Sequence, residues 1–207
     1  MFLSLGKSTG SIQYTLSFVF IVVVDARAAC FSGAYSVRTF FYFWGVNMDR
    51  STTATFIGHS DCSGIDVNAL RQEIVKLIEL GVTEFLNGGM GGFDWLCART
   101  VNGLKKTYPH IQNNLVIPYL SAKILKEDEA INRQIFDCIV YPEGFERYHF
   151  KAAITARNKY LVDNSSYAIC YVTTDSFKSG ALETYKRAVK KGLTVINLGG
   201  YKYEINS

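Results

Sequence analysis

The stretch VTEFLNGGMGGFDWL, from Val82 to Leu96, decides the fold. It passes from a short apolar run into a turn with four glycines among the five residues Gly88–Gly92, and then into a helical pattern. A strand that reaches a helix through such a turn brings backbone N–H groups to the helix N-terminus, which suits an anion such as phosphate. The Gly-x-Gly-x-x-Gly pattern of dinucleotide folds and the Gly-Lys-Ser/Thr ending of P-loops are both absent. We therefore expect a nucleotide-type ligand and leave its chemistry open.

Outward from this stretch, short apolar runs alternate with helical patterns. The predicted strands are Thr53–Ile57, Val82–Leu86, Leu115–Leu120, Cys138–Tyr141, Tyr167–Val172 and Leu193–Leu198. The predicted helices are Val67–Leu80, Phe93–Tyr108, Phe150–Val162 and Ala181–Lys191, while Lys123–Arg133 is either a short helix or a surface crossover. Apolar runs bounded by Gly, Pro, Asn or Asp fit strands buried on both faces. The pattern predicts an α/β fold, a three-layer Rossmann-like sandwich with a mostly parallel sheet.

The composition changes near Met48. Residues 1–47 are rich in Leu, Phe, Val, Ser and Thr and contain few charges. The apolar run Tyr14–Val24 is too short for a transmembrane helix, which needs ~20 residues, but would suit a signal-peptide core. We interpret residues 1–47 as an N-terminal extension without function, either disordered or upstream of a true start at Met48. Residues 48–207 are predicted to form one Rossmann-like domain.

Charge and cysteine content argue against several classes of protein. The chain has 22 Lys and Arg against 18 Asp and Glu, which gives no broad basic footprint for nucleic acid. Its five cysteines are odd in number and widely spaced, which indicates neither a disulfide framework nor a metal site. Cys138 and Cys170 lie in apolar runs and are expected to be buried. We expect a cytoplasmic protein that requires no cofactor and does not enter the membrane.

Four polar groups follow predicted strands or begin the elements just after them. They are Gly58-His59-Ser60-Asp61, the glycine turn with Asp94, Tyr141-Pro142-Glu143-Gly144, and Ser179-Gly180-Ala181 with Glu183. Because ligands of parallel α/β sheets bind at the carboxyl ends of strands, these groups predict one pocket.

Individual side chains in these groups have two interpretations each. His59 can donate to a phosphate or transfer protons near neutral pH, or it can merely hold its turn. Asp94 can bind a ribose hydroxyl, or it can stabilise the start of its helix. Arg157 and Asn158 can bind a phosphate and a base or ribose, or they can belong to a solvated helix face.

Six segments together resemble one family. They are TATFIGHSDC, GVTEFLNGGMGGFDWLCARTV, VIPYL, FDCIVYPEGFE, RNKYLVDNSSYAICYV and KKGLTVINL. In order and spacing they are similar to the YpsA-type branch of the SLOG superfamily, which also contains LOG-type nucleotide hydrolases and the Smf/DprA DNA-processing proteins. The resemblance implies a Rossmann-like sensor or regulator that binds a nucleotide or nucleotide-derived ligand. The ligand-binding residues it implies are Gly58, His59, Gly88, Gly89, Gly91, Gly92, Asp94, Arg157, Asn158 and Gly180.

Two departures from the family pattern bear on the ligand. Ser60 stands where the family usually has an Arg, which removes a guanidinium that could bind phosphate bidentately. Ser179-Gly180-Ala181 stands where the family usually has Gly-Gly-Thr, which removes a hydroxyl and adds a Cβ at a crowded turn. We therefore expect ligand affinity or identity to differ from the family norm.

Two alternative functions remain. A LOG-like phosphoribohydrolase would cleave the N-glycosidic bond of nucleoside monophosphates with a carboxylate near the sugar, for which Asp94, Glu143 and Glu183 are the candidates. Its signature Pro-Gly-Gly-x-Gly-Thr-x-x-Glu is absent, and the sequence shows no nucleophile–base pair. DprA-like binding of single-stranded DNA would need a basic face, with Lys105, Lys106, Lys186, Arg187, Lys190 and Lys191 as candidates.

Lysines at helix C-termini usually complement the helix dipole, so nucleic acid is disfavoured as a partner relative to a nucleotide-derived small molecule. A homo-oligomer is left open. We also expect Gly89→Val to abolish ligand retention while it leaves the fold intact.

Overall fold

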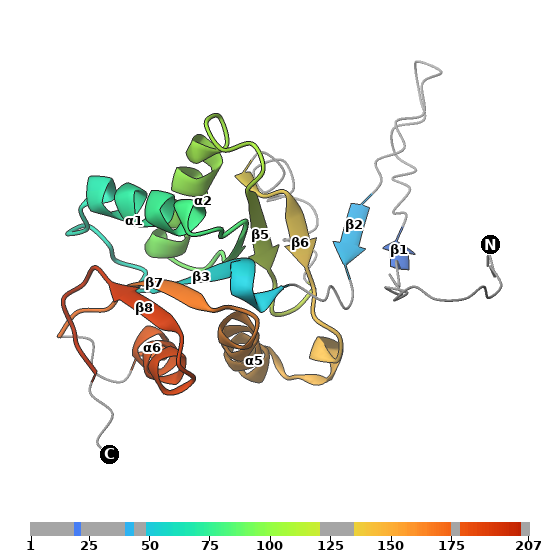
Figure 1. Ribbon diagram of the computed structural model, residues 1–207. Coiled ribbons are helices and arrows are strands. Elements are labelled where there is room, and N and C mark those ends of the chain that lie inside the picture. The colour runs from blue at the N-terminus through green and yellow to red at the C-terminus, as the bar shows by residue number, and fades with distance from the viewer. Residues whose placement is uncertain (1–18, 22–39, 44–48, 121–134, 175–178, 204–207) are drawn as a thin grey trace, which may run out of the picture.

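The computed structural model describes residues 19–21, 40–43, 49–120, 135–174 and 179–203 (Figure 1). Six parallel strands form its centre. Their order is β6 (Cys138–Val140), β5 (Gln112–Val116), β4 (Glu84–Asn87), β3 (Thr53–Gly58), β7 (Tyr167–Tyr171) and β8 (Thr194–Asn197). The chain moves stepwise from β3 out to β6 and then returns to β7 on the other side of β3. The winding therefore reverses between β3 and β7, and such a switch point is where ligands of this fold bind.

Two further short strands extend the sheet beyond β6. β2 (Phe40–Phe43) pairs in parallel with β6, and β1 (Val19–Ile21) pairs antiparallel with β2. Both come from the segment interpreted above as an N-terminal extension. The rest of that segment and Lys123–Arg133 lie outside the described residues, so these interpretations stay predictions.

Helices cover both faces of the sheet (Figure 1). α1 (Val67–Glu79) and α2 (Gly92–Leu104) lie on one face, and α5 (Phe150–Asp163) and α6 (Gly180–Lys190) on the other. Short 3-10 helices, Arg50–Thr52 and Phe145–Arg147, precede β3 and α5. The predicted α/β Rossmann-like sandwich with a mostly parallel sheet is confirmed.

The helices form for reasons visible in the sequence. The apolar stripe predicted for α1 is buried: Leu70, Ile74, Leu77 and Ile78. Its start is capped by Asp66, whose carboxylate accepts hydrogen bonds from two backbone amides of the first turn. Ser179 caps α6 in the same way by accepting from the amide of Leu182 at 3.1 Å.

β5 begins earlier than the apolar run that predicted it. The predicted strand was Leu115–Leu120, whereas the strand spans Gln112–Val116. In buried Asn113 and Asn114 the side-chain nitrogens donate, Asn113 Nδ2 to the Ala98 and Ile135 carbonyls and Asn114 Nδ2 to the Glu84 carboxylate. The search for apolar runs therefore missed the polar residues with which this strand begins. No helix among the described residues is long and apolar enough to cross a membrane.

Candidate functional site

A cavity of about 160 Å³ opens at the carboxyl end of β3, at the switch point of the sheet. Its walls come from β3, from the glycine turn before α2, and from the facing sides of α5 and α6. The lining residues are Phe56, Ile57, Gly58, Met90, Asp94, Ile154, Arg157, Asn158, Leu161, Gly180, Ala181 and Thr184. Five of the predicted ligand-binding residues thus line one cavity: Gly58, Asp94, Arg157, Asn158 and Gly180.

Arg157 is the dominant cation of this cavity. Only 4% of its surface is exposed, so it does not belong to a solvated helix face, which was the alternative interpretation. Its Nη1 donates to the Gly88 carbonyl and its Nη2 contacts Met90 Sδ at 3.2 Å, whereas the buried Nε has no hydrogen-bond partner. The guanidinium therefore braces the glycine turn and keeps one donor without a partner.

Asp94 is the matching anion. It is 7% exposed, and its Oδ2 accepts a hydrogen bond from the Met90 amide at 2.9 Å. Burial raises the pKa of this carboxyl to about 6, against the lowering effects of the Met90 amide and the Arg157 charge. Asp94 thus lies in the first turn of α2 and also lines the cavity, and its binding of a ribose hydroxyl stays a prediction.

Several backbone amides of the glycine turn and of the start of α2 already have hydrogen-bond acceptors. The Gly89 amide donates to Asn87 Oδ1 at 2.7 Å, and the Gly92 amide donates to the Ser60 carbonyl at 2.9 Å. The Phe93 amide makes a long contact of 3.4 Å with the His59 carbonyl. The expectation of bare N–H groups at this helix start is therefore wrong for these amides, because the loop after β3 caps them.

The glycines of the turn are required mainly for close packing. A Cβ at Gly88 would meet Arg157 Nη1 and would lie 2.9 Å from Asp94 Oδ2, and one at Gly91 would lie 3.0 Å from the Ser60 Cα. At Gly89, φ is 65° and a Cβ would lie 2.5 Å from a methyl carbon of Leu115. Gly89→Val therefore strains the fold itself, so the expectation that it leaves the fold intact is not supported.

Asn158 and the start of α6 form the opposite rim. Asn158 Nδ2 donates to Thr184 Oγ1 at 3.2 Å and so joins α5 to α6. Gly180 is exposed, and among the described residues nothing lies within 4 Å of a Cβ built on it. The Cβ that departs from the family pattern is that of Ser179, so the crowding expected there stays a prediction.

Seven of the candidate residues are not among those that line the cavity: His59, the turn glycines Gly88, Gly89, Gly91 and Gly92, and the carboxylates Glu143 and Glu183. His59 directly follows β3, and its Nε2 is buried without a hydrogen-bond partner, while desolvation lowers the pKa of its ring. Glu143 is exposed in the turn after β6. Glu183 is exposed on α6 and pairs with Lys186 at 3.4 Å. Of the three candidate carboxylates, only Asp94 is placed to reach a ligand in this cavity.

Sequence reasoning missed four contributors. Asn87 is fully buried, and it ties the glycine turn to α2 by donating from Nδ2 to the Asp94 carbonyl at 2.8 Å. Met90, Ile154 and Thr184 line the cavity. The signal for Asn87 was available, since a polar residue at the end of an apolar strand needs a partner. Thr184 and Ile154 follow one helical turn from Gly180 and Phe150, a spacing that could have been read as one helix face.

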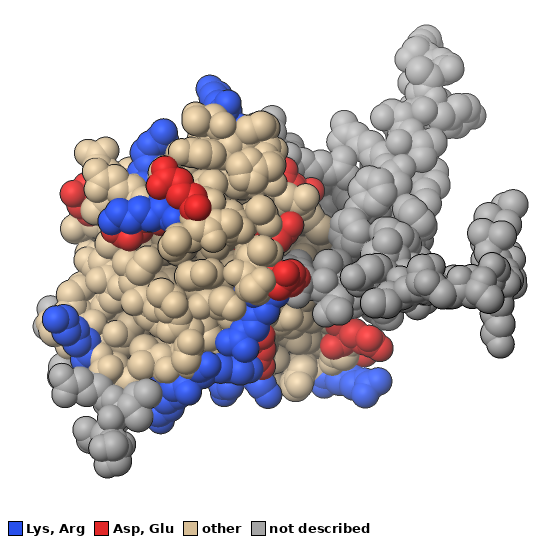
Figure 2. All heavy atoms as spheres, viewed as in Figure 1, with Lys and Arg blue, Asp and Glu red and all other residues tan. Residues whose placement is uncertain are grey.

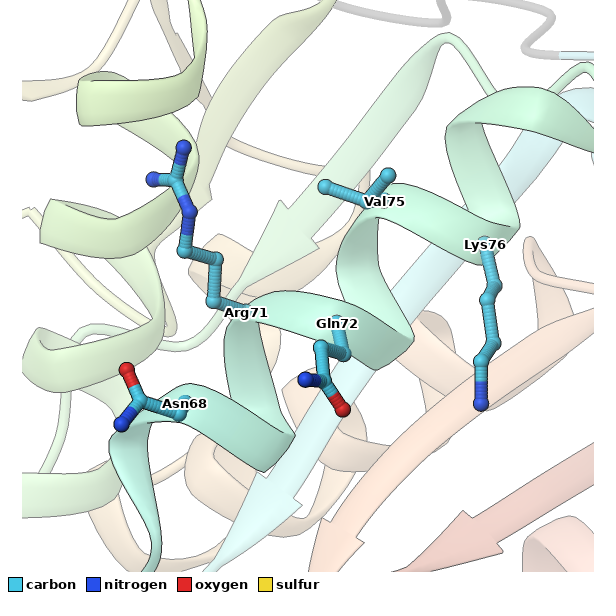
Figure 3. A pocket seen from close by; sticks show the side chains of 5 residues that line it. All are labelled: Asn68, Arg71, Gln72, Val75 and Lys76. Atoms are coloured by element: carbon cyan, nitrogen blue, oxygen red, sulfur yellow. The ribbon is translucent and has the colours of Figure 1, made fainter.

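A second hollow of about 530 Å³ lies on the outer surface of α1 (Figure 3). All of its lining residues come from that single helix: Asn68, Arg71, Gln72, Val75 and Lys76. Figure 3 shows Arg71 and Lys76 pointing in different directions from the helix, so their charges do not converge. Among the described residues, no group of three or more His, Cys, Asp or Glu side chains is arranged to hold a metal ion.

Comparisons with known proteins identify a family and a fold. A family profile described as the YspA SLOG family matches residues 59–195, which include all the cavity-lining residues except Phe56–Gly58. A UPF0398 protein of Halalkalibacterium halodurans is 31% identical over 128 residues, which are 59% of this chain and 66% of that protein.

Two solved structures share the fold. DNA processing protein A from Streptococcus pneumoniae has a TM-score of 0.54 at 16% identity, over 87% of this chain and 62% of that chain. The Helicobacter pylori protein, whose structure addresses its single-stranded DNA binding mode, has a TM-score of 0.51 at 17% identity, over 72% and 66%. This chain thus spans just under two thirds of the length of each relative.

Proposed function

Since this chain belongs to the YspA SLOG family, we propose that it acts as a sensor or regulator by binding a nucleotide-derived ligand in the cavity at the end of β3. SLOG domains bind nucleotide-derived ligands. The observation that carries the proposal is the buried pair of opposite charges, Asp94 and Arg157, on the wall of a cavity at the switch point. We keep the cytoplasm as the predicted location.

The chemistry of the lining suits the polar part of a nucleotide. Burial of a guanidinium costs free energy unless its donors find acceptors, and Arg157 Nε has none within the described residues. That nitrogen is buried out of reach of a ligand, but Arg157 also lines the cavity, where a phosphate or sugar oxygen would meet the positive charge of its guanidinium. The Asp94 carboxylate, with the amide of Asn158 and the hydroxyl of Thr184, offers acceptors and donors for ribose hydroxyls.

The size of the cavity limits what it can enclose. Ligand sites for whole small molecules typically measure ~300 to ~1,000 Å³, whereas this cavity measures about 160 Å³. It therefore holds one part of a nucleotide, and the remainder lies across its rim.

Native mass spectrometry of the full chain purified from its host tests the proposal. We expect a small molecule that survives purification and is identified, after denaturation, as a compound with a nucleoside or nucleotide unit. The combined variant Asp94→Asn, Asn158→Ala should lose it, while the exposed control Arg99→Ala should retain it. Retention of the same compound by the combined variant would contradict the assigned cavity.

A hydrolase is the second candidate, favoured by one observation. A carboxyl whose pKa is about 6 can donate or accept a proton near neutral pH, and Asp94 lines the cavity. Incubation with nucleoside monophosphates should then release free base, and Asp94→Asn should abolish the release. Glu183→Ala is the matched control, because Glu183 is an exposed carboxylate outside the cavity lining.

Single-stranded DNA binding has weaker support. Figure 2 shows Lys and Arg side chains gathered along the side of the molecule that carries α5 and α6. Three of the candidate lysines are paired with carboxylates, Lys105 with Asp137, Lys186 with Glu183 and Lys191 with Asp163. A salt-sensitive mobility shift of a labelled oligonucleotide would support this function, and no shift at low salt would exclude it.

A further inference from the structure

An exposed run that the cavity does not explain leads into the first turn of α5. All residues from Glu146 to Ala152 are exposed, and within them the sequence Arg147–Lys151 combines basic and aromatic side chains. Six large apolar side chains of the described residues are exposed, and only two of these, Tyr148 and Phe150, are aromatic. Exposure of two aromatic rings in one short run calls for a partner that stacks on them.

Of the two rings, Phe150 is the freer. Tyr148 packs edge-on against Phe145, with ring centroids 5.8 Å apart, so part of its role is structural. Phe150 has 52% of its surface exposed. The His149 ring lies 4.5 Å from it, and Lys151 Nζ lies 5.9 Å from its centroid. These neighbours leave an aromatic surface beside a cation.

The position of Phe150 on the helix connects it to the cavity. Phe150, Ile154, Arg157 and Leu161 follow at intervals of four, three and four residues, which places them on one face of α5. The last three of these line the cavity. At 1.5 Å per residue, Phe150 lies about 10 Å along the axis from Arg157.

The packing of α5 against α6 gives the level of Phe150 relative to the cavity along the helix axis. The two helices run side by side on the same face of the sheet (Figure 1). Asn158 bonds to Thr184, which lies one turn inside α6, so the first residue of α6 is level with about one turn before Asn158 on α5. Phe150 lies a further turn out. Phe150 thus lies one helical turn beyond the level of Gly180, which lines the cavity, and its side chain is exposed.

We propose that Phe150 is a base-stacking residue: the base of the ligand lies against its ring, while the sugar and phosphate occupy the Asp94–Arg157 cavity. This inference rests on the proposed function and narrows it to ligands that carry a base. It also explains how a cavity too small for a whole nucleotide could bind one, since the base would lie outside the cavity. Stacking of a base on an aromatic side chain changes affinity by about fivefold or more.

The test compares a ligand with a base and one without. Calorimetric titrations of the full chain use adenosine 5′-monophosphate and ribose 5-phosphate. We expect adenosine 5′-monophosphate to bind at least about fivefold more tightly, and Phe150→Ala to remove that difference without changing the affinity for ribose 5-phosphate. Phe150→Trp should restore it. Leu80→Ala, an exposed apolar residue after α1 on the opposite face of the sheet, should leave both affinities unchanged.

The outcomes separate this inference from the proposed function. Binding of both compounds with equal affinity, or a base preference that Phe150→Ala leaves intact, would overturn the stacking inference and leave the cavity assignment standing. Binding of neither compound to the wild-type chain would overturn the stacking inference, and the proposed function would fall with it if none of the other ribonucleoside 5′-monophosphates or 5′-diphosphates bound either. The thermal unfolding midpoint of each variant serves as the check that the fold is kept. We expect it to stay near the wild-type value, because Phe150 is exposed and its loss removes little packing.

Discussion

Asp94 and Arg157 converge on Gly88, although α2 and α5 lie on opposite faces of the sheet. The guanidinium donates to the Gly88 carbonyl, and Asp94 Oδ2 lies 2.9 Å from where a Gly88 Cβ would be. The glycine turn is thus where the two faces of the sheet meet at its carboxyl edge. The conformation of the glycine turn therefore depends on the side chains of Asp94 and Arg157, and the positions of these two side chains depend on that conformation.

The first prediction concerns pH. Burial raises the pKa of Asp94 from 3.8 to about 6, so between about pH 4 and 6 the folded state keeps a proton that the unfolded state releases. The wild-type free energy of unfolding therefore loses up to about 3 kcal/mol from this group as pH rises through that window. Asp94→Asn lacks this loss. Urea denaturation between pH 4 and 7.5 should show that the free energy of unfolding of Asp94→Asn rises relative to that of the wild type as pH increases.

Asp61→Asn serves as the control for that series. Asp61 is an exposed carboxylate whose pKa is lowered by hydrogen bonds from Ser63, so its effect has the opposite sign. Parallel stability curves for the wild type and Asp94→Asn would mean that the Asp94 carboxyl titrates normally in the folded state.

The second prediction concerns the space at Gly88. A Cβ there would displace the Arg157 guanidinium, so Gly88→Ala should lower the free energy of unfolding by about 2 kcal/mol or more and weaken ligand binding. Gly103→Ala is the matched control. Gly103 lies exposed in α2 with no described atom within 4 Å of its Cβ position, so alanine should stabilise the helix by about 0.5 to 1 kcal/mol. Equal effects of the two substitutions would contradict the packing assigned to Gly88.

The third prediction concerns Asn87. Its side chain accepts from the Gly89 amide and donates to the Asp94 carbonyl, so Asn87→Ala removes the acceptor of the Gly89 amide and the tie between the turn and α2. We expect about 2 kcal/mol or more of destabilisation by chemical denaturation. Asn68→Ala, an exposed residue on α1, should change stability by less than about 0.5 kcal/mol. A small effect at Asn87 would show that the turn holds its shape without that brace.

The sequence predicted how β3 to β8 and the four α-helices follow one another along the chain. It did so because buried parallel strands and amphipathic helices leave strong patterns. The apolar stripe of α1 is an example, since each predicted residue is buried. β5 was misplaced because Asn113 and Asn114 are buried through hydrogen bonds rather than through apolar character. Polar burial depends on partners distant in sequence, and a local pattern does not contain them.

The candidate site was predictable in part for a similar reason. The topology brings Gly58, Asp94, Arg157 and Gly180 to one cavity, as expected for the carboxyl ends of parallel strands. The sequence could not show which amides of the glycine turn are free to bind an anion. The carbonyl that accepts from the Gly92 amide belongs to Ser60, which lies in another loop. Which backbone amides remain free is a tertiary property.

The most direct test of the central claim is a calorimetric titration of the full chain with the ribonucleoside 5′-monophosphates and 5′-diphosphates. We expect saturable binding of at least one of them, which is lost in the combined variant Asp94→Asn, Asn158→Ala and kept in Glu183→Ala. Binding that is equal in the wild type and the combined variant, or no binding of any of these nucleotides to a folded wild-type chain, would contradict it.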